Sequence, residues 1–110
     1  MSDLTYPKPT RELAEMRRSL NPEAEAAFQA FSKAVFSDGA LSGKTKQLIA
    51  VAGAHVTQCP YCSTGHTKAA QRAGATPQEL MEAVWVAAEM RAGGAFAHST
   101  LMLSVPRQRS

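Results

Sequence analysis

The stretch that decides the fold runs from Ser42 to Gly74 and reads SGKTKQLIAVAGAHVTQCPYCSTGHTKAAQRAG. Its first half is almost wholly apolar after a Lys-rich start. Ser42 is a suitable N-cap, so this half predicts a buried central helix that ends near Thr57. Pro60 suits the first position of a helix and Gly74 suits a left-handed C-cap, so the second half predicts another helix. Two helices joined by a very short turn therefore form the centre of the predicted fold.

Helix signals also flank this central pair. Three more starts combine an N-cap residue with acidic residues or proline in the first turn, at Thr10, at Asn21 with Pro22, and at Thr76 with Pro77. We expect Gly93 and Gly94 to interrupt the last helix, which resumes beyond them. No segment alternates polar and β-branched residues, so the sequence predicts an all-α protein, a compact bundle of five to six helices without a sheet.

The length of 110 residues predicts a single domain over residues 1–110, with residues 1–9 as an extended arm. So short a chain has little material to cover a nearly all-apolar helix, which favours a homo-oligomer. Each flanking helix has an apolar stripe that we expect to be buried. The residues expected inside are Leu13, Met16, Leu20, Ala24, Phe28, Phe31, Val35, Leu80, Met81, Val84, Trp85 and Ala88.

The charge distribution and the apolar segments argue against several classes of protein function. The net charge of +3 is spread along the chain rather than gathered into a stripe, so nucleic-acid binding is not indicated. The first ten residues lack the apolar core of a signal peptide, and the apolar run from Leu48 to Val56 is too short to span a membrane. We therefore expect a soluble, cytoplasmic protein. In a reducing compartment, two cysteines indicate metal binding or redox chemistry rather than a structural disulfide.

The candidate site is the cluster of Cys59, Cys62 and His66 in the run QCPYCSTGH. With Pro60 at the first helical position, Cys59 falls on the N-cap, where free N–H groups and the helix dipole lower the pKa of a thiol. At about 100° per residue, Cys62 lies roughly 60° from Cys59 around the helix, and His66 lies within about 20° of Cys59. All three side chains therefore share one face.

This arrangement suits redox chemistry. The spacing allows Cys59 and Cys62 to close a disulfide that is readily made and broken, and His66 can move protons near neutral pH. The helix dipole favours Cys59 as the attacking thiol, whereas proximity to His66 favours Cys62, and the sequence leaves both open. Two alternatives remain: simple helix packing, and a zinc site in which His55 or His98 supplies a fourth ligand.

The segment from Gly39 to about Leu103 resembles the carboxymuconolactone decarboxylase superfamily, most closely its alkylhydroperoxidase D (AhpD-like) branch. The features that carry this resemblance are the Lys-rich helix start, the apolar helix and the Cys-x-x-Cys-x-x-x-His motif. It implies a helical homo-oligomer, a trimer or hexamer, that acts as a thiol-dependent peroxidase or disulfide reductase without a cofactor or bound metal. The implied partners are a small-molecule hydroperoxide or a disulfide-bearing redox protein.

Two positions depart from the branch's pattern. Gln47 stands where the motif has a glutamate of the proton relay, and Tyr61 stands where it has a histidine. Gln47 can still hydrogen-bond and orient His66 but carries no negative charge, so we expect weaker base catalysis. Tyr61 can donate to a peroxide oxygen or simply cover the helix start, and His98 is a further possible supporting residue. Glu82 or Glu89 could replace the missing glutamate.

The alternatives to a thiol peroxidase are a metal-binding or redox-responsive oligomeric module and a lactone decarboxylase. The decarboxylase branch does not use a cysteine pair, so Cys59 and Cys62 argue against that activity.

Overall fold

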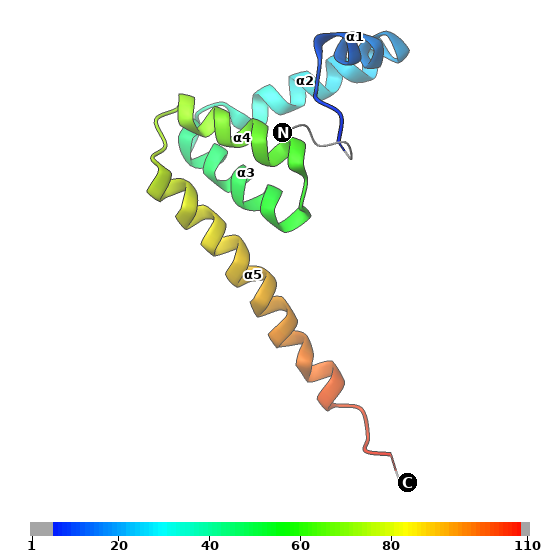
Figure 1. The fold of residues 1–110 in the computed structure, drawn as a ribbon, viewed down its shortest axis with the longest axis vertical. Coiled ribbons are helices and arrows are strands. Elements are labelled where there is room, and N and C mark those ends of the chain that lie inside the picture. The colour runs from blue at the N-terminus through cyan, green and yellow to red at the C-terminus, as the bar shows by residue number, and fades with distance from the viewer. Residues whose placement is uncertain (1–5, 109–110) are drawn as a thin grey trace. The chain divides into compact units, whose positions relative to one another are not determined.

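The structure is a computed structural model that describes residues 6–108, which contain five α-helices and no strand (Figure 1). The helices are α1 (Arg11–Leu20), α2 (Pro22–Phe36), α3 (Gly43–Thr57), α4 (Pro60–Arg72) and α5 (Pro77–Leu103). The prediction of an all-α fold is confirmed. Of the predicted arm, residues 1–5 lie outside the described part of the chain, and residues 6–9 precede α1 without forming a helix.

Every helix begins where the sequence predicts a start. In each case the side chain of the N-cap residue accepts a backbone N–H three residues later, at 3.1 to 3.2 Å. The five N-caps are Thr10, Asn21, Ser42, Cys59 and Thr76. These starts were predictable because a cap is a local contact between a side chain and its own first turn.

The chain divides into two compact units, residues 1–40 and residues 41–110. In the first unit, α1 packs against α2, and Arg17 and Glu25 approach to 3.9 Å. The second unit contains α3, α4 and α5 and holds the candidate site. The single-domain boundary of 1–110 stays a prediction.

Within the second unit, α3 is the central helix, as predicted, because it contacts both α4 and α5. The start of α3 is tied to the start of α5 by the ion pair of Lys44 Nζ with Glu79 Oε2 at 2.8 Å. The end of α3 is tied further along α5, where Arg91 donates a hydrogen bond to the carbonyl of Val56. The two helices therefore run in the same direction, and α5 continues past the end of α3 (Figure 1).

The prediction that Gly93 and Gly94 interrupt the last helix is wrong, because α5 is continuous from Pro77 to Leu103. Each glycine costs a helix about 1 kcal/mol relative to alanine, but it keeps the backbone N–H that the helix needs. Good helix formers on both sides carry the helix through the pair. No helix within residues 6–108 has the length and hydropathy that crossing a membrane requires.

The buried apolar side chains among the described residues are few and small: Val51, Ala54, Ala70 and Ala87. The expectation that the apolar stripes are buried is wrong in this single chain: among the residues expected inside, only Leu80 and Val84 are half-buried, and the others are exposed. Phe28, Phe31 and Trp85 are 62%, 65% and 64% exposed. A helical period shows that apolar side chains share one face, but it does not show that the chain itself covers that face.

Candidate active site

The turn between α3 and α4 places the cysteine pair. Gln58 adopts the left-handed conformation, with φ 59° and ψ 44°. The N–H groups of Gln58 and Cys59 both donate to the carbonyl of Ala54. These bonds close the end of α3 and offset the roughly 1 to 2 kcal/mol that a left-handed residue other than glycine costs. The chain therefore reverses within two residues, and Cys59 begins α4.

Cys59 is the N-cap of α4, as the sequence predicts. Its Sγ accepts the backbone N–H of Cys62 at 3.2 Å, and its carbonyl accepts the N–H of Ser63 at 2.9 Å. Both cysteines are free thiols, Cys59 partly buried and Cys62 exposed. The sulfur that caps the helix is therefore accessible to a small molecule.

The two thiols differ in acidity. The pKa of Cys59 is lowered, first by a hydrogen bond from the Cys62 thiol and then by the Cys62 backbone N–H. The pKa of Cys62 is raised by the same thiol hydrogen bond, by burial and by repulsion from a charged Cys59. The shared proton therefore stays on Cys62 while Cys59 becomes the thiolate, which is the nucleophilic form.

His66 lies on α4 two turns after Cys59, and a side chain of α3 orients its ring. Its Nδ1 is 2.7 Å from Oε1 of Gln47, a hydrogen bond of the kind that the sequence allows. Because an amide oxygen only accepts, Nδ1 carries the hydrogen and Nε2 is the nitrogen that takes up a proton. Gln47 thus sets the orientation of the ring without adding a charge.

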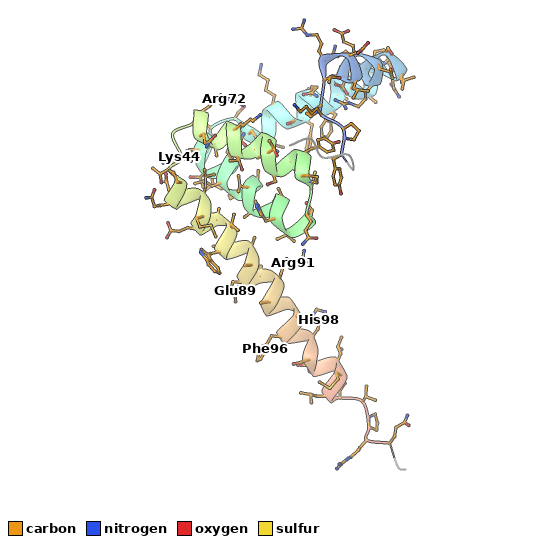
Figure 2. All side chains as sticks on the ribbon, in the orientation of Figure 1. Lys44, Arg72, Glu89, Arg91, Phe96 and His98 are labelled. Atoms are coloured by element: carbon orange, nitrogen blue, oxygen red, sulfur yellow. The ribbon has the colours of Figure 1, made fainter. Side chains whose placement is uncertain are left out.

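The other predicted site residues lie at different distances from this pair. Tyr61 is exposed in the first turn of α4, between the two cysteines. His55, on α3, is held by its own helix through Nδ1 and the carbonyl of Val51 at 2.7 Å. His98 follows Arg91 by two turns, past the end of α3, so the structure does not bring it to the cysteines (Figure 2).

The two acids considered as replacements for the missing glutamate lie on α5. Glu82 lines an apolar groove of about 380 Å³ between α3 and α5. The carboxylate of Glu89 lies against Gly93, one turn further along its own helix. Nδ1 of the His66 ring is hydrogen-bonded to the side-chain amide of Gln47.

A shallow cavity of about 310 Å³ adjoins the helix that carries the cysteines. Ser63 and Thr67 line it from α4, and His55 lines it from α3. Its apolar side comes from Val51, Pro77, Leu80, Met81 and Val84. A small organic group can be held here, beside the first half of α4.

Sequence reasoning missed Arg91, which joins α5 to the last turn of α3 just before the cysteine pair. The residue lies 35 positions from its partner and belongs to no motif, so only the packing of α5 on α3 reveals it. Among residues 6–108, no group of three or more His, Cys, Asp or Glu side chains is arranged to hold a metal ion.

Comparison with known proteins places this site in context. A sequence profile of the carboxymuconolactone decarboxylase family matches residues 22–104. The chain is 56% identical over 105 residues to a Paracoccus denitrificans protein named "Uncharacterized protein 4 in cox locus", covering 96% of this chain and 94% of that protein.

Two solved structures share the fold. One, from Methanobacterium thermoautotrophicum, has a TM-score of 0.72 and 38% identity, covering 76% of this chain and 94% of that one. The other, an apo carboxymuconolactone decarboxylase family protein from Legionella pneumophila, has a TM-score of 0.66 and 39% identity, covering 72% of this chain and 70% of that one.

Proposed function

The chain belongs to the carboxymuconolactone decarboxylase family, and from this premise we propose that it is a thiol-dependent oxidoreductase. It reduces an organic hydroperoxide, or the disulfide of a redox partner, through Cys59 and Cys62. The observation that carries the proposal is the Cys59 sulfur at the N-cap of α4, accepting the N–H of Cys62 at 3.2 Å. Helix N-termini favour negative charge, so this sulfur is stabilised as a thiolate.

The reaction begins when the Cys59 thiolate attacks one oxygen of the hydroperoxide. The O–O bond breaks, Cys59 becomes a sulfenic acid, and the departing alkoxide takes a proton to leave as an alcohol. Cys62 then attacks the oxidised sulfur, which releases water and leaves a disulfide between the two cysteines. An external dithiol returns the pair to the reduced state, so the electrons need no resident cofactor.

His66 supplies the proton transfers in this scheme. Nε2 accepts a proton as the thiolate forms and returns it to the leaving oxygen, directly or through one water. The hydrogen bond from Nδ1 to Gln47 keeps the ring oriented for both steps. General acid and base catalysis of this kind contributes roughly 10² to 10⁴ in rate, so His66→Ala should slow turnover by at least about a hundredfold.

The proposal is tested by hydroperoxide consumption with a dithiol reductant, measured for the wild type and for Cys59→Ser and Cys62→Ser. Each substitution should abolish turnover. Titration of wild-type thiols before and after one equivalent of peroxide should show both thiols lost together. Thr64→Ala, an exposed position on the same helix, is the matched control and should keep full activity.

Two outcomes contradict the proposal. Peroxide turnover by Cys62→Ser at the wild-type rate would show that no cysteine pair is involved. Lactone decarboxylation that survives the same substitution would assign the other activity of the family.

A further inference from the structure

The contact between Arg91 and Val56 links α5 to the turn that carries the cysteine pair. We propose that Arg91 is a positioning residue of this site: its guanidinium holds the carbonyl end of α3 and offsets the negative charge there, which favours the thiolate form of Cys59. The proposal depends on the proposed function only in taking Cys59 as the reactive sulfur.

The carbonyl end of α3 carries a partial negative charge. Val56 belongs to the last turn of that helix, whose carbonyls have no partners further along it and carry about half a negative charge. Cys59 follows Val56 by three residues, which is no more than about 11 Å of chain. Without compensation, the end of α3 disfavours a negative sulfur at the start of α4.

Arg91 brings a positive charge to this end of α3. Its side chain crosses from α5 and donates to the Val56 carbonyl, which places a permanent positive charge at the negative end of α3 (Figure 2). The screening length in 0.1 M salt is about 10 Å, which is comparable with the span of chain from Val56 to Cys59, so salt weakens the effect of this charge on Cys59 without removing it. The other titratable groups on the neighbouring turns of the two helices are Cys62, Tyr61 and His66 on α4 and His55 on α3.

Arg91 also helps to hold the turn after α3 in place. The turn after α3 is held by the N–H groups of Gln58 and Cys59 on the carbonyl of Ala54. Arg91 adds a clamp from another helix to the same turn of α3. A cation at a helix C-terminus interacts favourably with the last carbonyls of the helix, so Arg91 can stabilise the left-handed turn that presents Cys59.

The structure supplies a matched control at the opposite end of the same helix pair. Lys44 joins α3 to α5 through Glu79, and this pair has the same sequence separation as Val56 and Arg91. Lys44 is remote from the cysteines because it lies in the first turn of α3. Replacing it loosens the same packing without changing the charge near Cys59.

The test measures the pH dependence of Cys59 alkylation by iodoacetamide, with the labelled cysteine identified by mass spectrometry. Arg91→Gln keeps an N–H donor but loses the charge, and it should raise the pKa of the Cys59 thiol by about half a pH unit. Alkylation below that pKa should then slow about threefold. Arg91→Lys should recover most of the wild-type rate, and Lys44→Gln should leave the profile unchanged.

Two results overturn the inference: an Arg91→Gln profile that coincides with the wild type, or an equal change in Lys44→Gln. Thermal unfolding of each variant separates these effects from a general loss of stability. Alkylation needs no peroxidase activity, so the role of Arg91 can be established even if hydroperoxide turnover is absent, and the two proposals fail independently.

Discussion

At the scale of single residues, the two thiols of the pair are not equivalent. Because the Cys62 thiol and N–H lower the pKa of Cys59 while the pKa of Cys62 is raised, the thiolate population forms first at Cys59 as the pH rises. Limited alkylation at pH 6 to 7, followed by peptide mass spectrometry, should therefore label Cys59 before Cys62. Cys62→Ala removes the thiol donor and should shift the labelling of Cys59 to higher pH. Preferential labelling of Cys62 would reverse the proposed order of attack.

The hydrogen bond between His66 and Gln47 predicts the effect of restoring a carboxylate. In Gln47→Glu a charged acceptor replaces a neutral one 2.7 Å from Nδ1. A charged hydrogen bond is worth about 1 kcal/mol more than a neutral one, so peroxide turnover limited by proton transfer should rise about fivefold. Gln71→Glu adds the same charge at an exposed position of α4 and should have no such effect. A slower Gln47→Glu enzyme would argue against His66 as the proton carrier.

Much of the site could be predicted because its parts are close in sequence. The positions of Cys59, Cys62 and His66 follow from one proline and the helical repeat. The contact from Gln47, 19 residues from His66 on a different helix, was expected only from the resemblance to the family motif. The acidity order of the two thiols could not be predicted, since it depends on which sulfur donates to the other. Arg91 could not be predicted because no local signal marks a contact with a different helix.

At the scale of helices, the glycine pair lowers the stability of α5, and a substitution can restore it. A Cβ added at Gly94 would meet no atom within 4 Å, whereas one added at Gly93 would lie 3.3 Å from Glu89 Oε1. Gly94→Ala should therefore stabilise the protein by about 0.5 to 1 kcal/mol, because alanine favours the helix and has no clash in the chain. Gly93→Ala should gain less. Urea unfolding of both variants measures the difference, and destabilisation by Gly94→Ala would show that something packs against that side of α5.

The helix starts that carry an N-cap residue were predicted correctly. The interruption that was predicted from the glycine pair alone was wrong. Thr76 and Glu79 form a reciprocal capping box at 2.9 and 3.1 Å, as the sequence indicates. The glycine pair misled because glycine weakens a helix without removing a hydrogen bond, unlike proline. Whether a helix continues through a glycine pair therefore depends on the residues of the whole helix, not on the two glycines alone.

At the scale of the whole molecule, the apolar surface is too large for the small core that accompanies it. Within residues 6–108, four small buried side chains stand against exposed Trp85 and Phe96, the latter 81% accessible. We expect the chain to assemble as a homo-oligomer, a trimer or hexamer, because association is the usual way to cover such surface. Light scattering should give a mass of three or six chains of 11.8 kDa each.

A charge placed on the exposed apolar surface tests this expectation. Phe96→Asp should shift the population toward the monomer, because burying an unpaired carboxylate is costly. Gln78→Asp adds the same charge in the first turn of α5, where acidic residues are favoured, and should leave the assembly intact. A wild-type protein that stays monomeric at high concentration would contradict the expectation.

The sulfur at the N-cap of α4 links the chemistry of the pair to the stability of a helix. When Cys59 enters a disulfide, it loses its negative charge and becomes a poorer acceptor for the N–H that it holds in the reduced protein. Oxidation therefore costs the helix part of its cap, and the dithiol form is the more stable one. A pair whose reduced form is stabilised has a higher reduction potential, so an external dithiol should return it readily to the reduced state after each hydroperoxide turnover, and a hydroperoxide should be a better oxidant for it than a partner's disulfide.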